Sequence, residues 1–189
     1  WNQEVKNKKI LYSNFIQKNH LKISLNKRLG IKYKNIIKNI ILNLDKDNNI
    51  FHSLIKKFKY NFNFKKINRF KKYKNVVVIG MGGSILGSEA IYNFLKDKIK
   101  KNFIFVDNID KQTLKEIKNK KNFNKTLFII ISKSGNTIET IFNFIALNII
   151  KKKAKNIIII SEGKNNFLLQ LAQKMQLLHI EHKAYIGGR

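Results

Sequence analysis

Three hydroxyl side chains lie close together in the run S-K-S-G-N-T, at Ser132, Ser134 and Thr137. The apolar run Leu127 to Ile131 precedes them, and the helical spacing of apolar residues resumes after Thr137. This pattern predicts a buried strand, a turn and a helix. Hydroxyls and free N–H groups at a helix N-terminus favour an anion such as phosphate, because the backbone donors are unsatisfied and the dipole end is positive. The alternative is that these residues only form a turn and cap the helix.

A second turn of this kind lies in the run K-N-V-V-V-I-G-M-G-G-S-I-L-G-S-E-A, from Lys74 to Ala90. A predicted strand, Val76 to Ile79, leads into glycines and the hydroxyl of Ser84. A dinucleotide-binding G-x-G-x-x-G motif would need glycine in place of Ile85, although Asp107 imitates its ribose-binding acid. The missing glycine therefore disfavours a nicotinamide-binding domain, which ranks third among the functions considered for this sequence. The phosphate loop of nucleotide hydrolases is excluded because its lysine is missing.

Strands and helices alternate from Asn75 onward. The predicted strands are Val76 to Ile79, Phe103 to Asp107, Leu127 to Ile131, Ile157 to Ile160 and Leu177 to Glu181. The predicted helices are Ser84 to Lys98, Lys111 to Lys118, Thr137 to Lys151 and Asn166 to Lys174. Such alternation indicates parallel βαβ units with right-handed crossovers. A strand order of 2-1-3-4-5 would place the first and third strands side by side, with their following helices on opposite faces, and make the two turns the walls of one site.

Residues 1–74 differ in texture, being rich in lysine and asparagine and helical where they are periodic. One apolar face is formed by Ile36, Ile37, Ile40, Ile41 and Leu44. A second is formed by Ile50, Phe51, Leu54, Ile55 and Phe58. We expect amphipathic helices that pack against a neighbouring layer; the alternative is that their lysines bind an acidic membrane surface. The predicted organisation is a helical segment, 1–74, followed by an α/β domain, 75–189.

Three runs resemble the phosphoglucose isomerase family in order and approximate spacing. They are G-x-G-G-S-x-L-G at Gly80 to Gly87, S-K-S-G-N-T-I-E-T at Ser132 to Thr140, and I-G-G-R at Ile186 to Arg189. The resemblance covers roughly residues 75–189. It implies an α/β fold of the sugar-isomerase (SIS) type, a three-layer α-β-α domain with a mostly parallel five-stranded sheet.

The resemblance also assigns site residues. Phosphate binding falls on Ser132, Ser134 and Thr137, with Lys133 beside them, and substrate contact falls on Gly83 and Ser84. Arg189 matches the family's active-site arginine, an electrostatic partner for the developing oxyanion. Glu139 could orient a ring-opening histidine, or could only place favourable charge at a helix N-terminus. The family's catalytic glutamate, histidine and lysine are expected beyond Arg189.

The activity implied by the resemblance is the reversible conversion of glucose 6-phosphate into fructose 6-phosphate through an enediol, in glycolysis and gluconeogenesis, without a cofactor. The chain opens on Trp1 and stops inside a motif at Arg189, so we expect an N-terminal portion of such an enzyme. The whole enzyme is expected to be a homodimer. The alternative is a non-catalytic regulatory module that binds sugar phosphates, against which the terminal G-G-R argues.

The formal net charge of +28 is the usual mark of a nucleic-acid-binding protein. However, all but three of the 39 basic residues are lysines, and arginine is the residue that reads base edges and stacks on bases. Lysine, asparagine, isoleucine and phenylalanine are abundant together, and their codons are rich in A and T. A genome biased toward these bases would give this composition without any selection for nucleic-acid binding. We therefore expect no specific nucleic-acid partner, and only salt-sensitive attraction to polyanions.

Cysteine is absent, which excludes disulfides and thiolate metal sites. His179 and His182, with Glu181 between them, would lie on opposite faces of a strand, so no metal site is predicted. The longest apolar runs fall well short of the roughly 20 residues of a membrane span. We expect a soluble, cytoplasmic protein that does not bind membranes.

Overall fold

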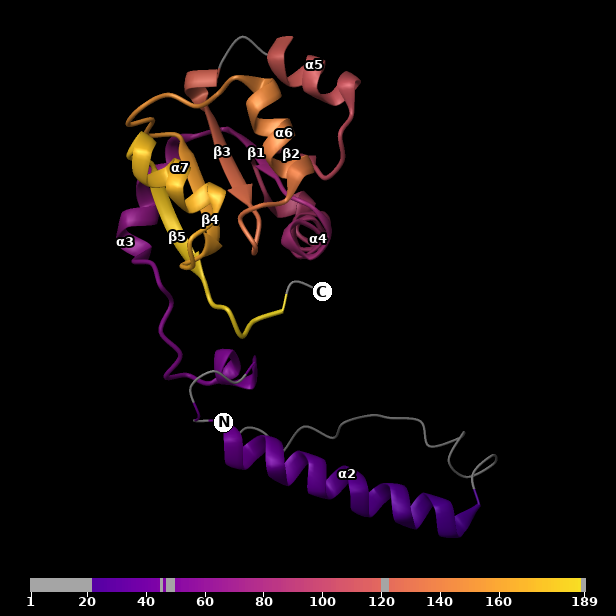
Figure 1. The fold of residues 1–189 in the computed structure, drawn as a ribbon. Coiled ribbons are helices and arrows are strands. Elements are labelled where there is room, and N and C mark those ends of the chain that lie inside the picture. The colour runs from indigo at the N-terminus through magenta and orange to yellow at the C-terminus, as the bar shows by residue number, and fades with distance from the viewer. Residues whose placement is uncertain (1–21, 45, 47–49, 120–122, 188–189) are drawn as a thin grey trace. The chain divides into compact units, whose positions relative to one another are not determined.

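The computed structural model describes residues 22–44, 46, 50–119 and 123–187 (Figure 1). The chain divides into two compact units, Trp1–Ile55 and Lys56–Arg189. The expected boundary after residue 74 falls inside the second unit, so residues 56–74 lie in the same compact unit as the sheet. The assignment of 1–74 as a separate helical segment stays a prediction.

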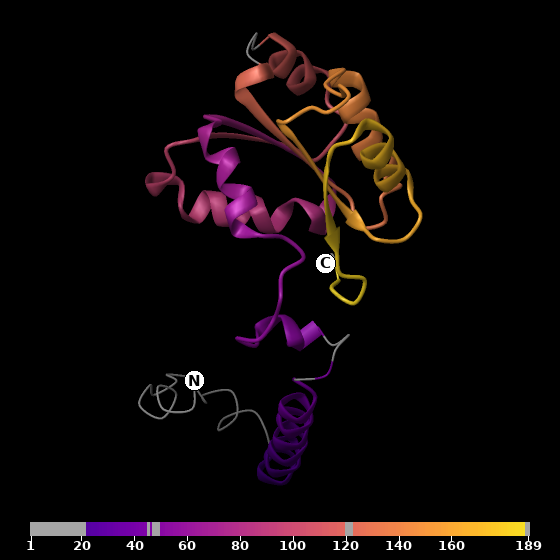
Figure 2. The same ribbon diagram turned by 90° about the vertical axis from the view of Figure 1, so that its left-hand side faces the viewer.

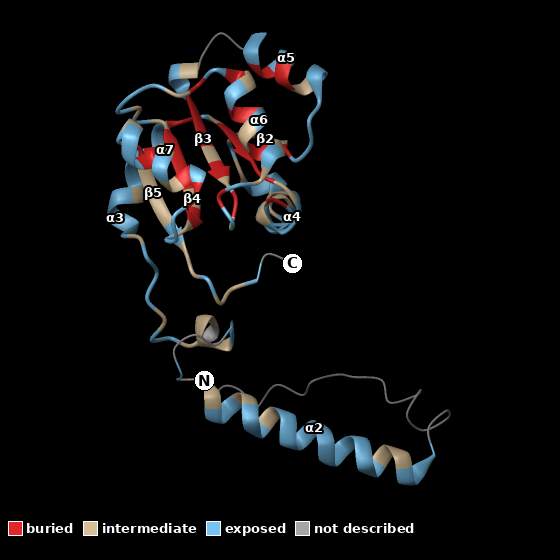
Figure 3. Cartoon of the chain, in the orientation of Figure 1, coloured by how far each residue is buried: buried red, intermediate tan, exposed pale blue. Residues whose placement is uncertain are grey.

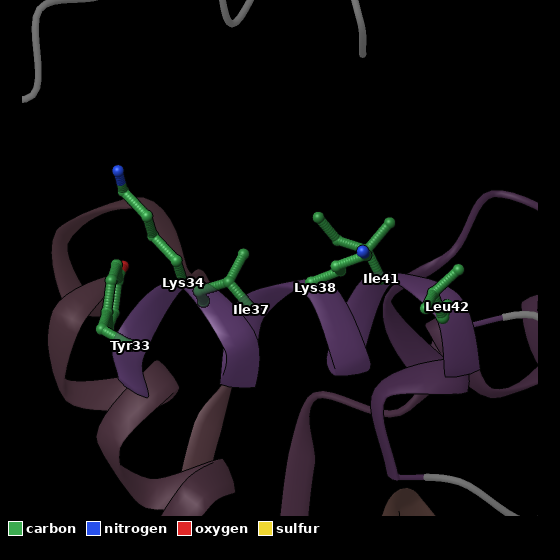
Figure 4. A pocket seen from close by; sticks show the side chains of 6 residues that line it. All are labelled: Tyr33, Lys34, Ile37, Lys38, Ile41 and Leu42. Carbon is green, nitrogen blue, oxygen red and sulfur yellow. The ribbon is translucent and has the colours of Figure 1, made fainter. Parts of the chain in front are cut away.

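The first unit contains the helix α2 (Ile23–Asn43) and the 3-10 turn η2 (Ile50–Leu54). No residue of α2 is buried, and a shallow groove of about 340 Å³ runs along one side of the helix (Figure 4). The groove is lined by Tyr33, Lys34, Ile37, Lys38, Ile41 and Leu42. Its lining is three aliphatic side chains, one tyrosine and two lysines, and it lacks the converging polar groups of a small-molecule site. Among the described residues, no helix has the length and apolarity needed to cross a bilayer.

The second apolar face predicted between Ile50 and Phe58 does not form an α-helix. The helical segment ends at Leu54 after a single 3-10 stretch, a geometry that rarely continues for long. From Phe58 onward the aromatic residues alternate with polar ones, and successive rings contact one another edge-on or tilted, with 5.2–5.3 Å between their centroids, in the order Phe58, Tyr60, Phe62 and Phe64. Side chains two residues apart share one side of an extended chain, so this alternation opposes a helix.

The second unit is built on a five-stranded sheet in which every pair is parallel. Its strands are β1 (Asn75–Ile79), β2 (Asn102–Val106), β3 (Thr126–Ile131), β4 (Ile157–Glu162) and β5 (Leu178–His182). Their order is β2-β1-β3-β4-β5, which confirms the predicted order 2-1-3-4-5. The apolar runs of β1, β3 and β4 occupy the three central positions, where both faces of a parallel sheet are covered.

Helices cover both faces, giving the predicted three layers (Figures 1 and 2). One face is covered by α5 (Lys111–Asn119), α6 (Ile138–Leu147) and α7 (Phe167–Met175), and the other by α3 (Phe64–Ile67), η3 (Asn68–Lys72) and α4 (Leu86–Phe94). Buried residues concentrate on the strands and on the inner sides of α5, α6 and α7, whereas α3 and α4 contain none (Figure 3). The helices that follow β1 and β3 therefore lie on opposite faces, as predicted.

Two helices are shorter than the sequence predicts. The helix expected over Ser84 to Lys98 is three pieces: η4 (Gly82–Ser84), α4 and η5 (Lys96–Lys98). The helix expected to reach Lys151 ends at Leu147, because Asn148 takes a left-handed conformation with φ of 52°. Asparagine tolerates that conformation and often ends a helix in this way.

Candidate functional site

The two predicted turns adjoin at the carboxyl ends of neighbouring strands. Ile79, the last residue of β1, pairs with Ile130 of β3. A Cβ atom placed on Gly80 would lie 3.1 Å from the carbonyl oxygen of Ile131 and 3.4 Å from the Cβ of Ser84. The glycine-rich turn therefore lies against the end of β3, and glycine permits this close approach.

The turn after β1 is short and tightly folded. Gly82 has a φ of +53°, and the N–H groups of Ser84 and Ile85 donate to the carbonyl oxygens of Met81 and Gly82, at 3.1 and 3.0 Å. Gly83 is exposed and Ser84 is half-buried, so both are open to a ligand. Ile85 is fully buried and belongs to a core cluster. Its side chain occupies the position at which a dinucleotide-binding turn needs glycine, which opposes the nicotinamide interpretation.

The three hydroxyls of the turn after β3 converge. The Oγ of Ser132 lies 2.8 Å from the Oγ1 of Thr137 and 3.4 Å from the Oγ of Ser134, and it accepts a bond of 3.1 Å from the N–H of Gly135. Ser132 is only 2% exposed, whereas Ser134 is exposed and Thr137 is half-buried. Ser132 thus forms the base of the cluster, and Ser134 and Thr137 are the hydroxyls that a ligand reaches first.

Helix capping does not account for these hydroxyls. Thr137 stands at the N-cap of α6, but its side chain makes no cap bond to the helix. Ser134 accepts a bond of 3.3 Å from the N–H of Asn136, within the turn itself. The first N–H groups of α6 are therefore left without a side-chain acceptor, beside a cluster of hydroxyl donors. This arrangement can bind an anion.

Two carboxylates adjust the charge around the turn. The Nζ of Lys133 lies 3.6 Å from the Oε1 of Glu162, so its positive charge is partly balanced. Glu139 is half-buried in the first turn of α6, and its side chain makes no hydrogen bond or ion pair with a described residue. A carboxylate there interacts favourably with the helix dipole. Arg189, the predicted electrostatic partner, lies outside the described residues.

The two histidines of β5, His179 and His182, make contacts with other protein groups. The Nε2 of His179 lies 2.9 Å from the Oγ of the buried Ser161, and the Nδ1 of His182 lies 2.9 Å from the carbonyl oxygen of Lys183. Within the part of the chain that the structure describes, no three metal-ligating side chains gather.

The protonation of His179 gives a testable pH dependence. Burial lowers the pKa of His179 below its ordinary value of 6.5, although the charge of Glu181 and the contact with Ser161 oppose this shift. As the pH falls through 6.5, the unfolded chain binds a proton on this histidine before the folded protein does, so the native state loses stability. We expect the free energy of unfolding, measured with urea, to fall between pH 7 and 5, and to fall less in His179→Gln. Equal pH slopes in both proteins would contradict this.

Asn166 is a residue of the site region that the sequence analysis placed only at the start of a helix. It caps α7 and lies against Gly135 in the turn after β3. The available signal was an asparagine before a helical pattern, in the loop after the neighbouring strand. That signal predicts that Asn166 caps the helix, but it does not predict that Asn166 contacts the turn after β3.

The comparisons with known proteins agree with one another. The family model for phosphoglucose isomerase matches residues 29–180. A glucose-6-phosphate isomerase from Borreliella afzelii (strain PKo) is 35% identical over 221 residues, covering 92% of this chain and 41% of the relative. One from Methanocaldococcus jannaschii is 38% identical over 135 residues, covering 71% of this chain and 32% of the relative. The chain thus spans less than half the length of these curated relatives.

Solved structures have the same fold. A glucose-6-phosphate isomerase from Chlamydia trachomatis D/UW-3/Cx superposes with a TM-score of 0.54 at 26% identity, over 66% of this chain and 25% of that one. A hypothetical protein from Thermus thermophilus superposes with a TM-score of 0.64 over 86% of this chain and 41% of that one; at 17% identity it bears on the fold alone. With the family model matching most of its length, the chain belongs to the phosphoglucose isomerase family.

Proposed function

We propose that the chain forms the phosphate-binding part of a glucose-6-phosphate isomerase. The observation that carries the proposal is the convergence of Ser132, Ser134 and Thr137 at an uncapped helix N-terminus. Uncharged donors beside a positive dipole end suit a phosphate dianion. The fold then corresponds to a sugar-isomerase (SIS) domain.

The roles follow from the arrangement of the two turns. Ser134 and Thr137 donate to phosphate oxygens, and Lys133 adds positive charge beside them. The exposed backbone at Gly83 and the hydroxyl of Ser84 contact the sugar, because the turn after β1 adjoins the turn after β3. Holding the phosphate at one end fixes the sugar carbons against the groups that move the proton.

The chemistry is an aldose–ketose isomerisation that needs no cofactor. A base removes the proton at C2 and returns it at C1, and Arg189 stabilises the enediolate oxygen that carries the developing charge. Glu139 orients the group that opens the sugar ring. The whole enzyme works as a cytoplasmic homodimer in glycolysis and gluconeogenesis.

The phosphate assignment is tested by removing single hydroxyls. In the whole protein, Ser134→Ala and Thr137→Ala should each weaken the binding of glucose 6-phosphate by about 1–3 kcal/mol, the cost when a charged group loses a hydrogen-bond partner. Isothermal titration calorimetry measures the change. Ser53→Ala is the matched control. Ser53 is half-buried, and its hydroxyl donates a hydrogen bond of 2.8 Å to the backbone carbonyl of Ile50 in η2, outside the unit that contains the sheet. Unchanged affinity in both site variants would remove the assignment.

A further inference from the structure

The turn after β3 is hydrogen-bonded to the first two residues of α7, the helix that follows the loop after β4. The carbonyl oxygen of Gly135 accepts a bond of 3.1 Å from the N–H of Leu168, and the Oδ1 of Asn136 accepts one of 2.9 Å from the N–H of Phe167. The phosphate turn proposed above therefore meets the start of α7, an element that carries none of its hydroxyls.

The first half of the same turn is hydrogen-bonded to Glu162, the last residue of β4. The carbonyl oxygen of Lys133 accepts a bond of 3.0 Å from the N–H of Glu162, in addition to the contact between the two charged side chains. Residues 133, 135 and 136 thus each accept a hydrogen bond from a residue in the range 162–168. Contacts on both sides of Ser134 restrict the positions that its hydroxyl can take.

Asn166 holds this loop in its conformation. Its Nδ2 donates to the carbonyl oxygens of Glu162 and Lys164, at 3.0 and 2.7 Å, while its Oδ1 accepts a bond of 2.9 Å from the N–H of Leu169. The side chain is buried, with 6% of the residue exposed. An N-cap needs only the oxygen acceptor, so the two bonds from Nδ2 serve the loop and not the helix.

Asn166 also packs directly against the centre of the phosphate turn. A Cβ atom on Gly135 would fall 1.9 Å from the Oδ1 of Asn166 and 2.2 Å from its Cγ. Such distances leave no room for a side chain at residue 135, so the amide group lies on the Cα of that glycine. The position of Asn166 therefore fixes the position of the bend at which the hydroxyls converge.

We propose that Asn166 is a positioning residue for phosphate binding: it holds the loop after β4 against Gly135 and so keeps the hydroxyls of Ser132, Ser134 and Thr137 together. The proposal rests on the function proposed above. A site that is already ordered binds its ligand without the cost of ordering, and small displacements of the binding groups lower affinity strongly.

Asn166→Ser separates the loop role from the cap role. Serine is as good an N-cap as asparagine but lacks the amide that bonds to the two carbonyls. It adds no charge that would repel a phosphate. We expect the affinity of the whole protein for glucose 6-phosphate, measured by calorimetry, to fall roughly 10-fold. In steady-state kinetics KM should rise more than kcat falls, because the phosphate lies away from the reacting carbons.

Asp110→Ala is the matched control. Asp110 stands before α5, which has nine residues as α7 does, and its carboxylate accepts from the N–H groups of Gln112 and Thr113 at 3.1 and 2.8 Å. Asp110→Ala removes these hydrogen bonds at the start of a helix in the same unit, so it should lower stability. It also removes a negative charge, which cannot weaken the binding of an anion. We expect the urea midpoint to fall while affinity and KM stay at the wild-type values.

The outcomes distinguish the two proposals. If Ser134→Ala weakens binding and Asn166→Ser does not, the phosphate site stands and the positioning role is wrong. If Asp110→Ala raises KM as much as Asn166→Ser, the effect is general destabilisation and the positioning role is again wrong. If the wild-type protein binds neither glucose 6-phosphate nor inorganic phosphate, the proposed function fails and the positioning role fails with it.

Discussion

Replacing Gly135 by alanine is expected to destabilise the sheet unit by about 2–5 kcal/mol and to remove phosphate binding. Two separate costs add. The residue has a φ of +68°, which an L side chain rarely adopts. Its new Cβ would also overlap Asn166, which is buried and fixed by three hydrogen bonds. Since the turn cannot keep its present path, its hydroxyls should no longer converge.

Urea unfolding and calorimetry with glucose 6-phosphate measure the two effects of Gly135→Ala. Gly87→Ala is the control, because Gly87 lies in α4 and a Cβ there would have nothing within 4 Å, so alanine should stabilise by up to about 1 kcal/mol. Adding Asn166→Gly to Gly135→Ala removes the overlap but also the three hydrogen bonds of Asn166, and it leaves the strained φ. The double variant should therefore lose less stability than the sum of the losses in the two single variants. If Gly135→Ala kept the stability and the affinity of the wild-type protein, the turn would be able to accommodate a side chain at residue 135, and the prediction would be wrong.

The fold could be predicted because its strongest signals are local. The runs Val76 to Ile79 and Leu127 to Ile131 are apolar without alternation, a pattern that favours a strand covered on both faces. Once these strands and three further ones alternate with helices, short right-handed connections leave few possible orders. The adjacency of the turns after β1 and β3 follows from that order, and so the two halves of the candidate site could be predicted together.

The helix ends could not be predicted because small energies decide them. Apolar spacing continues past Leu147, but Asn148 ends the helix by adopting a left-handed backbone. Between Ile50 and Phe58 the spacing fits a helix, and the alternating aromatics that follow favour an extended chain. A pattern with two interpretations is settled by the packing of the whole unit.

The interior of the site could not be predicted because it depends on contacts between loops. The sequence shows three hydroxyls at Ser132, Ser134 and Thr137, but not that Ser132 is buried beneath the other two. The sequence indicates that Gly135 gives the backbone freedom to bend, whereas the structure shows that the amide of Asn166 fills the space beside this glycine. Residues 31 positions apart meet there because β3 and β4 are neighbours and their loops have compatible shapes.

Replacing Arg189 by lysine in the whole protein is expected to lower kcat by roughly 100- to 1,000-fold, while the affinity for glucose 6-phosphate changes much less. Lysine keeps the positive charge but loses the planar, multi-donor guanidinium that can hold an enediolate oxygen at fixed angles. An interaction that strengthens as charge develops contributes to the transition state more than to substrate binding.

The comparison with Ser134→Ala gives this experiment its resolving power. Loss of the serine hydroxyl should affect binding more than turnover, because the phosphate carries the same charge before and during the reaction. Loss of the arginine should affect turnover more than binding, because the oxyanion exists only during the reaction. Steady-state kinetics and calorimetry on both variants separate these patterns. If Arg189→Lys lost affinity and turnover in equal proportion through KM, the arginine would act in ground-state binding, and another group would have to stabilise the enediolate.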